Sequence, residues 1–155
     1  MPTDQQIDYQ QLGDWMAEHD RAAQALGIRL EAVGAGSCRA TLTVGEEMLN
    51  AVGLTHGGVT FTLADFAFAV ASNSHGRTAV ALNAAITFTA ASRVGDVLTA
   101  TASEENCGGR TATYRVDVRN QNGELVGLFT GTVYRRNESI TEHMPDAMER
   151  RSGND

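Results

Sequence analysis

The most unusual chemical feature of the sequence is a single carboxylate within an apolar run. Asp65 lies in LTHGGVTFTLADFAFAVASN, residues 54–73, where almost every other side chain is apolar or carries a hydroxyl group. An ionised carboxylate that is shut away from water destabilises the fold unless hydrogen-bond donors satisfy it. Asp65 is therefore either a structural residue, bonded to the Thr62 hydroxyl or capping a neighbouring helix, or a functional carboxylate whose pKa is raised by burial.

The residues His56-Gly57-Gly58 form a second feature, just before the apolar run. We expect Thr55 to be the N-cap of a helix from about His56 to Ser72. The start of that helix would present unpaired N–H groups at the positive end of the helix dipole, and glycine would let a substrate oxygen approach the backbone closely. This arrangement is what an oxyanion hole requires.

The two features are too far apart to act on one atom within a single helix. His56 and Asp65 are nine positions apart, which corresponds to about 13 Å along the axis, and they lie on opposite sides of the helix. The sequence therefore predicts that a second copy of the chain completes the site.

The sequence lacks the motifs of several other enzyme classes. No G-x-S-x-G sequence is present, which argues against a serine hydrolase, and no Rossmann or P-loop signature occurs. The histidines show no HxxxH spacing, so we expect no metal site, and a histidine near a helix start is more often a capping or packing residue than a catalyst. Cys38 and Cys107 form no CxxC pair, which predicts free thiols in a reducing compartment.

Length and charge narrow the class of protein further. A chain of 155 residues fits one domain, and we expect a cytoplasmic location because the start of the sequence resembles no secretory signal. The formal net charge of −7 argues against nucleic-acid binding, and no segment is apolar for long enough to cross a membrane. All 12 basic residues are arginine, which can bind phosphate through two parallel hydrogen bonds.

The elements that must position these residues follow from hydrophobic periodicity. Apolar residues at helical spacing predict an N-terminal helix over 8–26 that ends at Gly27, and alternation predicts a strand over 37–44. Four further strands are expected over 78–88, 97–106, 110–119 and 124–134, joined by turns rich in glycine and asparagine. A helix this apolar must be wrapped by the sheet or buried at a subunit contact. We predict an α+β fold, a curled antiparallel sheet around one long central helix. The domain is expected to span 1–136, followed by a mobile tail over 137–155.

These residues and their spacing resemble a known family. The pattern N-x(5)-H-G-G-x(6)-D, from Asn50 to Asp65, together with the NS-x-G sequence that follows the helix, is similar to that of the PaaI-type phenylacetyl-CoA thioesterases of the hotdog-fold superfamily. The resemblance extends from about His19 to Arg135. It implies a hotdog homodimer, usually paired again into a tetramer, with active sites at the dimer interface, and hydrolysis of acyl-CoA thioesters without a metal or other cofactor. It also implies a role in phenylacetate catabolism.

The resemblance assigns roles by position. Asp65 would be the catalytic base or nucleophile, Gly57 would donate its N–H to the thioester carbonyl, Asn50 would help to place the water, and His56 would shape the same loop. The candidate substrate-binding residues are Gly58, Thr62, Phe66, Arg93 and Arg110. Phe66 stands where the family usually has a small hydroxyl residue, which suggests a reshaped acyl pocket. Arg93 and Arg110 are candidates for the coenzyme A phosphates or ordinary surface residues.

Three functions remain open on this basis. The leading hypothesis is hydrolysis of (hydroxy)phenylacetyl-CoA or another aryl or medium-chain acyl-CoA. An enoyl-CoA hydratase or dehydratase of the same fold would use Asp65 and His56 as its acid–base pair. A non-catalytic acyl-CoA-binding protein would use the fold only to bind. Coenzyme A enters each hypothesis as part of the ligand.

Overall fold

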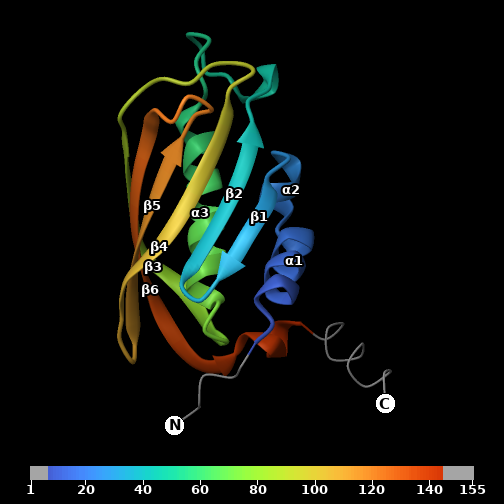
Figure 1. The fold of residues 1–155 in the computed structure, drawn as a ribbon, viewed down its shortest axis with the longest axis vertical. Coiled ribbons are helices and arrows are strands. Elements are labelled where there is room, and N and C mark those ends of the chain that lie inside the picture. The colour runs from blue at the N-terminus through green and yellow to red at the C-terminus, as the bar shows by residue number, and fades with distance from the viewer. Residues whose placement is uncertain (1–6, 145–155) are drawn as a thin grey trace.

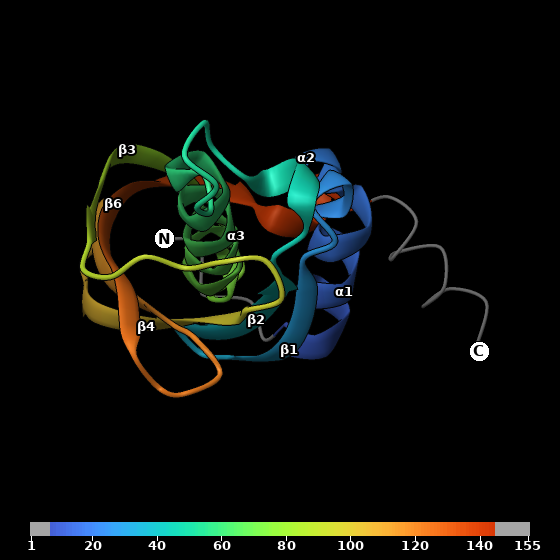
Figure 2. The same ribbon diagram turned by 90° about the horizontal axis from the view of Figure 1, so that it is seen from above.

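Helix α3, Gly57–Asn73, is the centre of the fold, as the apolar run predicts. The computed structural model describes residues 7–144, and 11 of the 17 residues of α3 are buried. A six-stranded sheet curls around this helix, and helices α1 and α2 lie beside it at one edge of the sheet (Figures 1 and 2). The predicted α+β architecture is therefore confirmed.

The sheet is antiparallel throughout, with the strand order β1-β2-β4-β5-β6-β3. Its strands are β1 (Arg29–Gly34), β2 (Ser37–Thr43), β3 (Arg77–Phe88), β4 (Val97–Cys107), β5 (Thr111–Arg119) and β6 (Leu125–Ser139). Five of the six coincide closely with the predicted strands. The alternation pattern did not reveal β1, because the register shifts between Leu30 and Ala32 and the strand shows no regular alternation of buried and exposed residues.

The N-terminal segment forms two helices rather than the single helix predicted over 8–26. Helix α1 covers Tyr9–His19 and α2 covers Arg21–Ala25. Asp20 separates them, since its backbone is extended and its carboxylate accepts a hydrogen bond from the Ala23 N–H at 2.9 Å. Aspartate is a strong N-cap, and here it starts a new helix within a helical hydrophobic pattern. Gly27 follows α2 with φ +68°, the left-handed conformation expected of it.

Two other predicted boundaries differ from the structure. The N-cap of α3 is His56 rather than Thr55. Strand β6 continues to Ser139, and a 3₁₀ helix follows over Ile140–His143, so ordered structure extends beyond residue 136, where the domain was expected to end. Ile140 is buried against Leu12 and Met144. Residues 145–155 of the expected tail lie outside the described residues.

Aromatic packing fixes α3 against the inner face of the sheet. The ring of Phe68 meets those of Tyr114 and Phe129 at centroid distances of 5.8 and 5.4 Å. Gly131 on β6 makes room for Phe68, because a Cβ there would lie 2.7 Å from the phenylalanine ring. Phe68 thereby packs α3 against β5 and β6. No helix within residues 7–144 has the length and apolar character to cross a membrane.

Candidate active site

The N-terminus of α3 leaves one backbone donor unpaired. The ring of His56 caps the helix, since its Nδ1 atom accepts a hydrogen bond from the Gly58 N–H at 2.9 Å, and its carbonyl oxygen accepts from the Val59 N–H at 2.9 Å. The Gly57 N–H has no partner among the described residues. His56 therefore caps α3, and its cap uses the Gly58 donor while leaving the Gly57 donor without a partner among the described residues.

A cleft of ≈ 430 Å³ lies beside this helix end. Its walls come from the loop before α3, the first turn of α3, the end of β3 with the segment that follows it, and the start of β6. They consist of Asn50, Leu54, Thr55, Gly57, Thr60, Phe88, Thr89, Ala90, Ala91, Ser92 and Val126. The lining mixes apolar side chains with several hydroxyl groups and one amide, a combination that small-molecule sites use to hold and orient a ligand. The Thr55 hydroxyl is one of these groups, and it is buried without a hydrogen-bond partner within residues 7–144.

Asn50 combines a structural role with a free donor. Its Oδ1 atom accepts hydrogen bonds from the Val52 and Leu54 N–H groups at 3.0 and 3.1 Å, which fixes the loop before α3. Its Nδ2 group has no partner in the part of the chain that the structure describes. The side chain is thus held in one orientation with an N–H donor left for a ligand in the cleft.

Asp65 lies on the one face of α3 that the sheet does not cover. Gly58, Thr62 and Ala69 share this face, at spacings of three to four residues, and all are at least partly exposed. The Thr62 hydroxyl donates to the Gly58 carbonyl oxygen at 2.7 Å and therefore not to Asp65, which was one of the two structural roles expected for that carboxylate. Within residues 7–144 the Asp65 carboxylate accepts no hydrogen bond.

Burial and a second acid disfavour the charged form of Asp65. Burial raises the pKa of the Asp65 carboxyl, and the negative charge of Asp20 raises it further. Asp20 lies close enough to affect Asp65 because it occupies the break between helices α1 and α2. The sequence analysis did not identify Asp20, whose only local signal is an acidic N-cap residue within the helical pattern of residues 8–26.

One chain does not bring the Asp65 carboxylate to the Gly57 donor. Eight residues of helix separate them, which is about 12 Å along the axis, and Asp65 is not among the residues that line the cleft. The separation between Asp65 and the start of α3 that the sequence predicted is therefore present in the folded chain.

Phe66, a candidate for a reshaped acyl pocket, does not line the cleft. Its side chain is only 2% exposed and packs in the core, because it lies on the α3 surface that the sheet covers. Phe88, at the end of β3, contributes the aromatic side chain of the cleft instead and is 53% exposed. Its place beside Gly57 depends on how β3 passes the helix, which no local pattern records.

The two candidate arginines lie at opposite ends of β4. Arg93 is exposed in the turn just after the cleft residues Ala91 and Ser92. Arg110 is exposed in the turn after β4, where its carbonyl oxygen accepts from the Arg135 N–H at 2.7 Å. Eleven residues of strand span about 33 Å between these turns. A single chain therefore cannot bring both guanidinium groups to the same phosphate.

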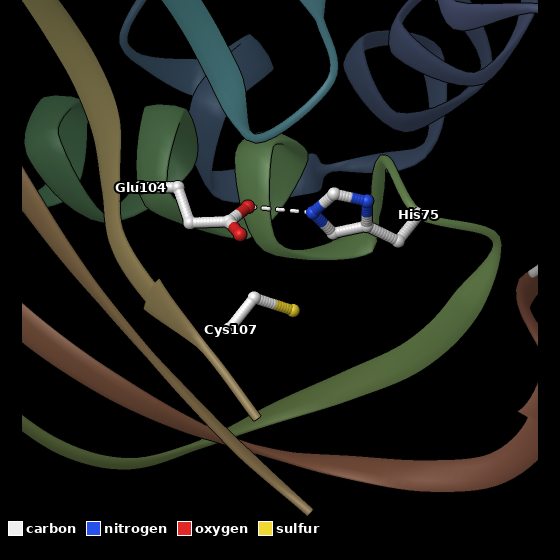
Figure 3. A group of neighbouring side chains, drawn as sticks. All are labelled: His75, Glu104 and Cys107. Carbon is white, nitrogen blue, oxygen red and sulfur yellow. Dashed lines mark hydrogen bonds and ion pairs between the residues drawn. The ribbon is translucent and has the colours of Figure 1, made fainter. Parts of the chain in front are cut away.

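Metal-ligating groups gather at the other end of α3. Ligand atoms of His75, Glu104 and Cys107 all lie within 4.8 Å of one another (Figure 3). Spacing along the sequence gave no sign of this group, because the histidine is far from both other residues in the chain.

The chain is similar to known thioesterases over most of its length. The family model described as "Thioesterase superfamily" matches residues 52–127. The acyl-coenzyme A thioesterase PaaI of Escherichia coli (strain K12) is 42% identical over 126 residues, which cover 81% of this chain and 90% of that protein.

Solved structures support the same relationship. The structure of the E. coli PaaI protein from the phenylacetic acid degradation operon matches with a TM-score of 0.82 and 40% identity, covering 84% of this chain and 95% of that one. A hypothetical thioesterase protein of Streptococcus pneumoniae TIGR4, solved with coenzyme A, matches with a TM-score of 0.72 and 31% identity over 76% of this chain and 93% of that one.

Proposed function

The chain belongs to the hotdog-fold thioesterase superfamily and is a PaaI-type thioester hydrolase, and from this premise we propose that its substrates are (hydroxy)phenylacetyl-CoA or other aryl or medium-chain acyl-CoA thioesters. The observation that carries the proposal is the Gly57 N–H, which has no partner among the described residues and belongs to a residue that lines the cleft. A single backbone donor held at a helix N-terminus is suited to the oxygen of a thioester carbonyl.

In the proposed reaction, Gly57 stabilises charge and Asp65 handles the proton. As a general base, Asp65 takes a proton from water while the water oxygen bonds to the thioester carbon, and the carbonyl oxygen becomes an oxyanion that accepts from the Gly57 N–H. Collapse of this intermediate breaks the carbon–sulfur bond, and the coenzyme A thiolate takes the proton from Asp65. As a nucleophile, the Asp65 carboxylate would instead bond to the thioester carbon and expel the coenzyme A thiolate, leaving a mixed anhydride that water hydrolyses to the free acid and the carboxylate.

The surroundings of Asp65 support this role. A carboxyl group whose pKa is raised by burial and by Asp20 is a stronger base than an exposed aspartate. Asn50 would orient the water or the partner's carboxylate through its free Nδ2 group. The Gly58 N–H already donates to His56 Nδ1 and the Thr62 hydroxyl to the Gly58 carbonyl oxygen, so we assign neither donor a direct hydrogen bond to the substrate.

A homodimer would complete the site. Strand β3 is an edge of the sheet, twelve residues long, with Val80, Leu82 and Phe88 exposed by 41, 61 and 53%. Such an edge is prone to pair with another strand. Antiparallel pairing of two β3 strands about a two-fold axis would place the end of one beside the start of the other. The Asp65 of one chain could then serve the Gly57 of its partner, and two dimers would pair into a tetramer.

The cleft could hold an apolar acyl group, and exposed arginines could bind the phosphates of coenzyme A. Leu54, Phe88 and Val126 provide the apolar walls. Arg93 and Arg110 are exposed and make no side-chain hydrogen bond or ion pair in the described chain, so both are available to coenzyme A phosphates. They would serve one ligand only if they came from different chains. No cofactor takes part in this proposal, since coenzyme A belongs to the substrate.

The test is release of free thiol from a panel of thioesters by the wild type and Asp65→Asn. The panel contains phenylacetyl-CoA, hydroxyphenylacetyl-CoA, benzoyl-CoA, hexanoyl-CoA and palmitoyl-CoA. We expect a preference for aryl or medium-chain substrates, and a loss of kcat of about 10²–10⁴ in Asp65→Asn with little change in KM. Glu104→Gln, which replaces a carboxylate on β4 close to the C-terminal end of α3, is the matched control and should retain turnover.

Two other outcomes would reject the proposal. Loss of enoyl absorbance from an enoyl-CoA without thiol release would indicate a hydratase. Binding of acyl-CoA with no turnover in the wild type, and equal affinity in Asp65→Asn, would indicate a protein that only binds the ligand.

A further inference from the structure

The group of side chains at the C-terminal end of α3 is separate from the cleft and is not used in thioester hydrolysis. His75 lies in the loop between α3 and β3, and Glu104 and Cys107 lie near the end of β4. The His75 Nε2 atom is 2.5 Å from the Glu104 Oε2 atom, and the Cys107 sulfur is within 4.8 Å of the ligand atoms of both (Figure 3). The two ion-pair side chains are each about one-fifth exposed.

A β-bulge brings the two β4 residues to the same face of the sheet. Residues three apart in a regular strand point to opposite faces. Between Glu104 and Asn106 the register with β5 shifts by one residue, so Glu104 is opposite Tyr114 and Cys107 is opposite Ala112. Tyr114 and Ala112 are both buried. Glu104 and Cys107 therefore share the inner side of the sheet, as bulges commonly re-aim side chains.

The surrounding backbone and side chains hold the group in place. The Gly36 N–H donates to Ser74 Oγ at 2.8 Å, and this hydroxyl donates to the Ala71 carbonyl oxygen at 2.7 Å, which ties the β1–β2 turn to the end of α3. A Cβ at Gly36 would overlap the Glu104 carboxylate. Tyr114 donates its hydroxyl to Glu104 Oε2 at 3.2 Å. Such outer contacts orient ligands in protein metal sites.

The charges around the group favour an ionised carboxylate. Burial works to raise the pKa of Glu104, but hydrogen bonding and charge from His75, with further hydrogen bonds from Tyr114 and Cys107, lower it below its usual range. Burial and the Glu104 charge raise the pKa of the Tyr114 hydroxyl, which keeps it a donor. The nearby Arg135 guanidinium donates to the Gly108 carbonyl oxygen at 2.7 Å.

An imidazole nitrogen, a carboxylate oxygen and a thiolate sulfur are ligands that zinc accepts together. At bond lengths of about 2.0–2.3 Å and tetrahedral angles, the ligand atoms of one zinc ion are about 3.3–3.6 Å apart. The observed group needs side-chain rotations that move the ligand atoms by about an ångström to reach this geometry. The cation would replace the His75–Glu104 bond, and the thiol proton would pass to solvent.

We propose that His75, Glu104 and Cys107 form a binding site for a zinc-class divalent cation, with water as the fourth ligand. The ion would join the α3–β3 loop to the end of β4. The site stands apart from the thioesterase cleft, and the inference does not depend on the proposed substrate.

Cobalt(II) titration of the purified full-length chain tests the site, with a reductant that contains no thiol. We expect one Co²⁺ per chain, visible d–d bands of a tetrahedral ion, and a near-ultraviolet charge-transfer band from a thiolate. Added Zn²⁺ should abolish these bands. The sequence has only two cysteines, and burial raises the pKa of Cys38 to about 12, so the thiolate signal reports on Cys107.

Matched variants distinguish this site from other binding. Cys107→Ser should abolish the charge-transfer band, and His75→Gln should weaken Co²⁺ binding by at least about tenfold. Cys38→Ala and His143→Gln should leave binding unchanged, because Cys38 is buried in the core and His143 forms a separate exposed pair with Glu138 at 3.3 Å. Circular dichroism would verify that each variant is folded, and a Zn²⁺-dependent rise in Tm that Cys107→Ser lacks would give a second measurement.

Several results would overturn the proposal. These are absence of the charge-transfer band in the wild type at millimolar Co²⁺, a band that survives in Cys107→Ser, and a stoichiometry of one ion per two chains. The last would indicate a thiolate site shared between copies.

Discussion

The two ends of α3 carry similar polar groups but leave them in different states. At the N-terminal end, the Gly57 N–H and the Asn50 Nδ2 group have no partners within residues 7–144, and the Asp65 carboxylate on the same helix has none either. At the C-terminal end, the Glu104 carboxylate accepts hydrogen bonds from His75 and Tyr114. Both ends lie within the same curled sheet (Figure 1).

The difference separates groups left without a partner, which the thioester substrate could bond, from groups that are already paired in the free protein. A polar group without a partner lowers stability, and its natural partner in an enzyme is the substrate or the transition state. A group that is already paired contributes to stability in the free protein. Substitutions near Gly57 should therefore change turnover, whereas substitutions near Glu104 should change stability.

The largest effect is expected from removing the free donor. Gly57→Pro eliminates the N–H while keeping the helix, because proline is tolerated at the first helical position and His56 already has the extended backbone, φ −60° and ψ 132°, that precedes proline. We expect kcat to fall by about 10²–10³, measured as thiol release.

Gly57→Ala is the steric control for this substitution. It keeps the N–H and adds a Cβ 2.8 Å from the end of the exposed Phe88 ring, which can move. The alanine variant should retain most of its kcat. Equal losses in the two variants would contradict the role of the N–H group.

Asn50→Asp should have the next largest effect. The carboxylate can still accept from the Val52 and Leu54 N–H groups, but it lacks the Nδ2 donor. The loss of one hydrogen bond of about 0.5–1.5 kcal/mol lowers kcat/KM by up to about tenfold, with Tm little changed. Asn50→Ala removes both functions and should lower Tm as well. A large fall in Tm for Asn50→Asp would indicate that Asn50 mainly stabilises the fold rather than binding the substrate.

Glu104→Gln should show the opposite behaviour, with turnover kept and stability reduced by about 1 kcal/mol at neutral pH. Because the pKa of Glu104 is lower in the folded state than in the unfolded state, its contribution to stability is present above the ordinary carboxyl range. That contribution is lost as the pH falls through the lowered folded-state pKa. Urea unfolding of wild type and variant over a pH series would measure this, and the two curves should converge in acid.

The smallest effect is expected from Asp20→Asn. Asparagine keeps the cap on the Ala23 N–H but removes the negative charge that raises the pKa of Asp65. The acid limb of the kcat/KM profile should therefore move to lower pH. Asp14→Asn, on the preceding helix, should leave the profile in place. An unchanged profile in Asp20→Asn would show that burial alone sets the pKa of Asp65.

Local patterns predicted most of the fold. The alternation of Cys38, Ala40 and Leu42 defines β2, and the apolar run around Asp65 predicted a wrapped helix correctly. These predictions succeeded because burial of one face or of a whole helix leaves its own period in the sequence. Positions where a cap or a bulge interrupts the period were missed, namely the helix break at Asp20 and strand β1.

The sequence by itself determined the chemical groups, the central helix and the free donor at its start. The spacing from His56 to Asp65 also showed that the two residues cannot act on the same atom within one helix. Only the tertiary structure decided which side chains meet across elements. It buried Phe66, placed Phe88 at the cleft, and used a bulge in β4 to bring Glu104 and Cys107 to His75. Such meetings depend on strand register and on where each strand crosses the helix, and these are set by packing over the whole chain rather than by neighbouring residues.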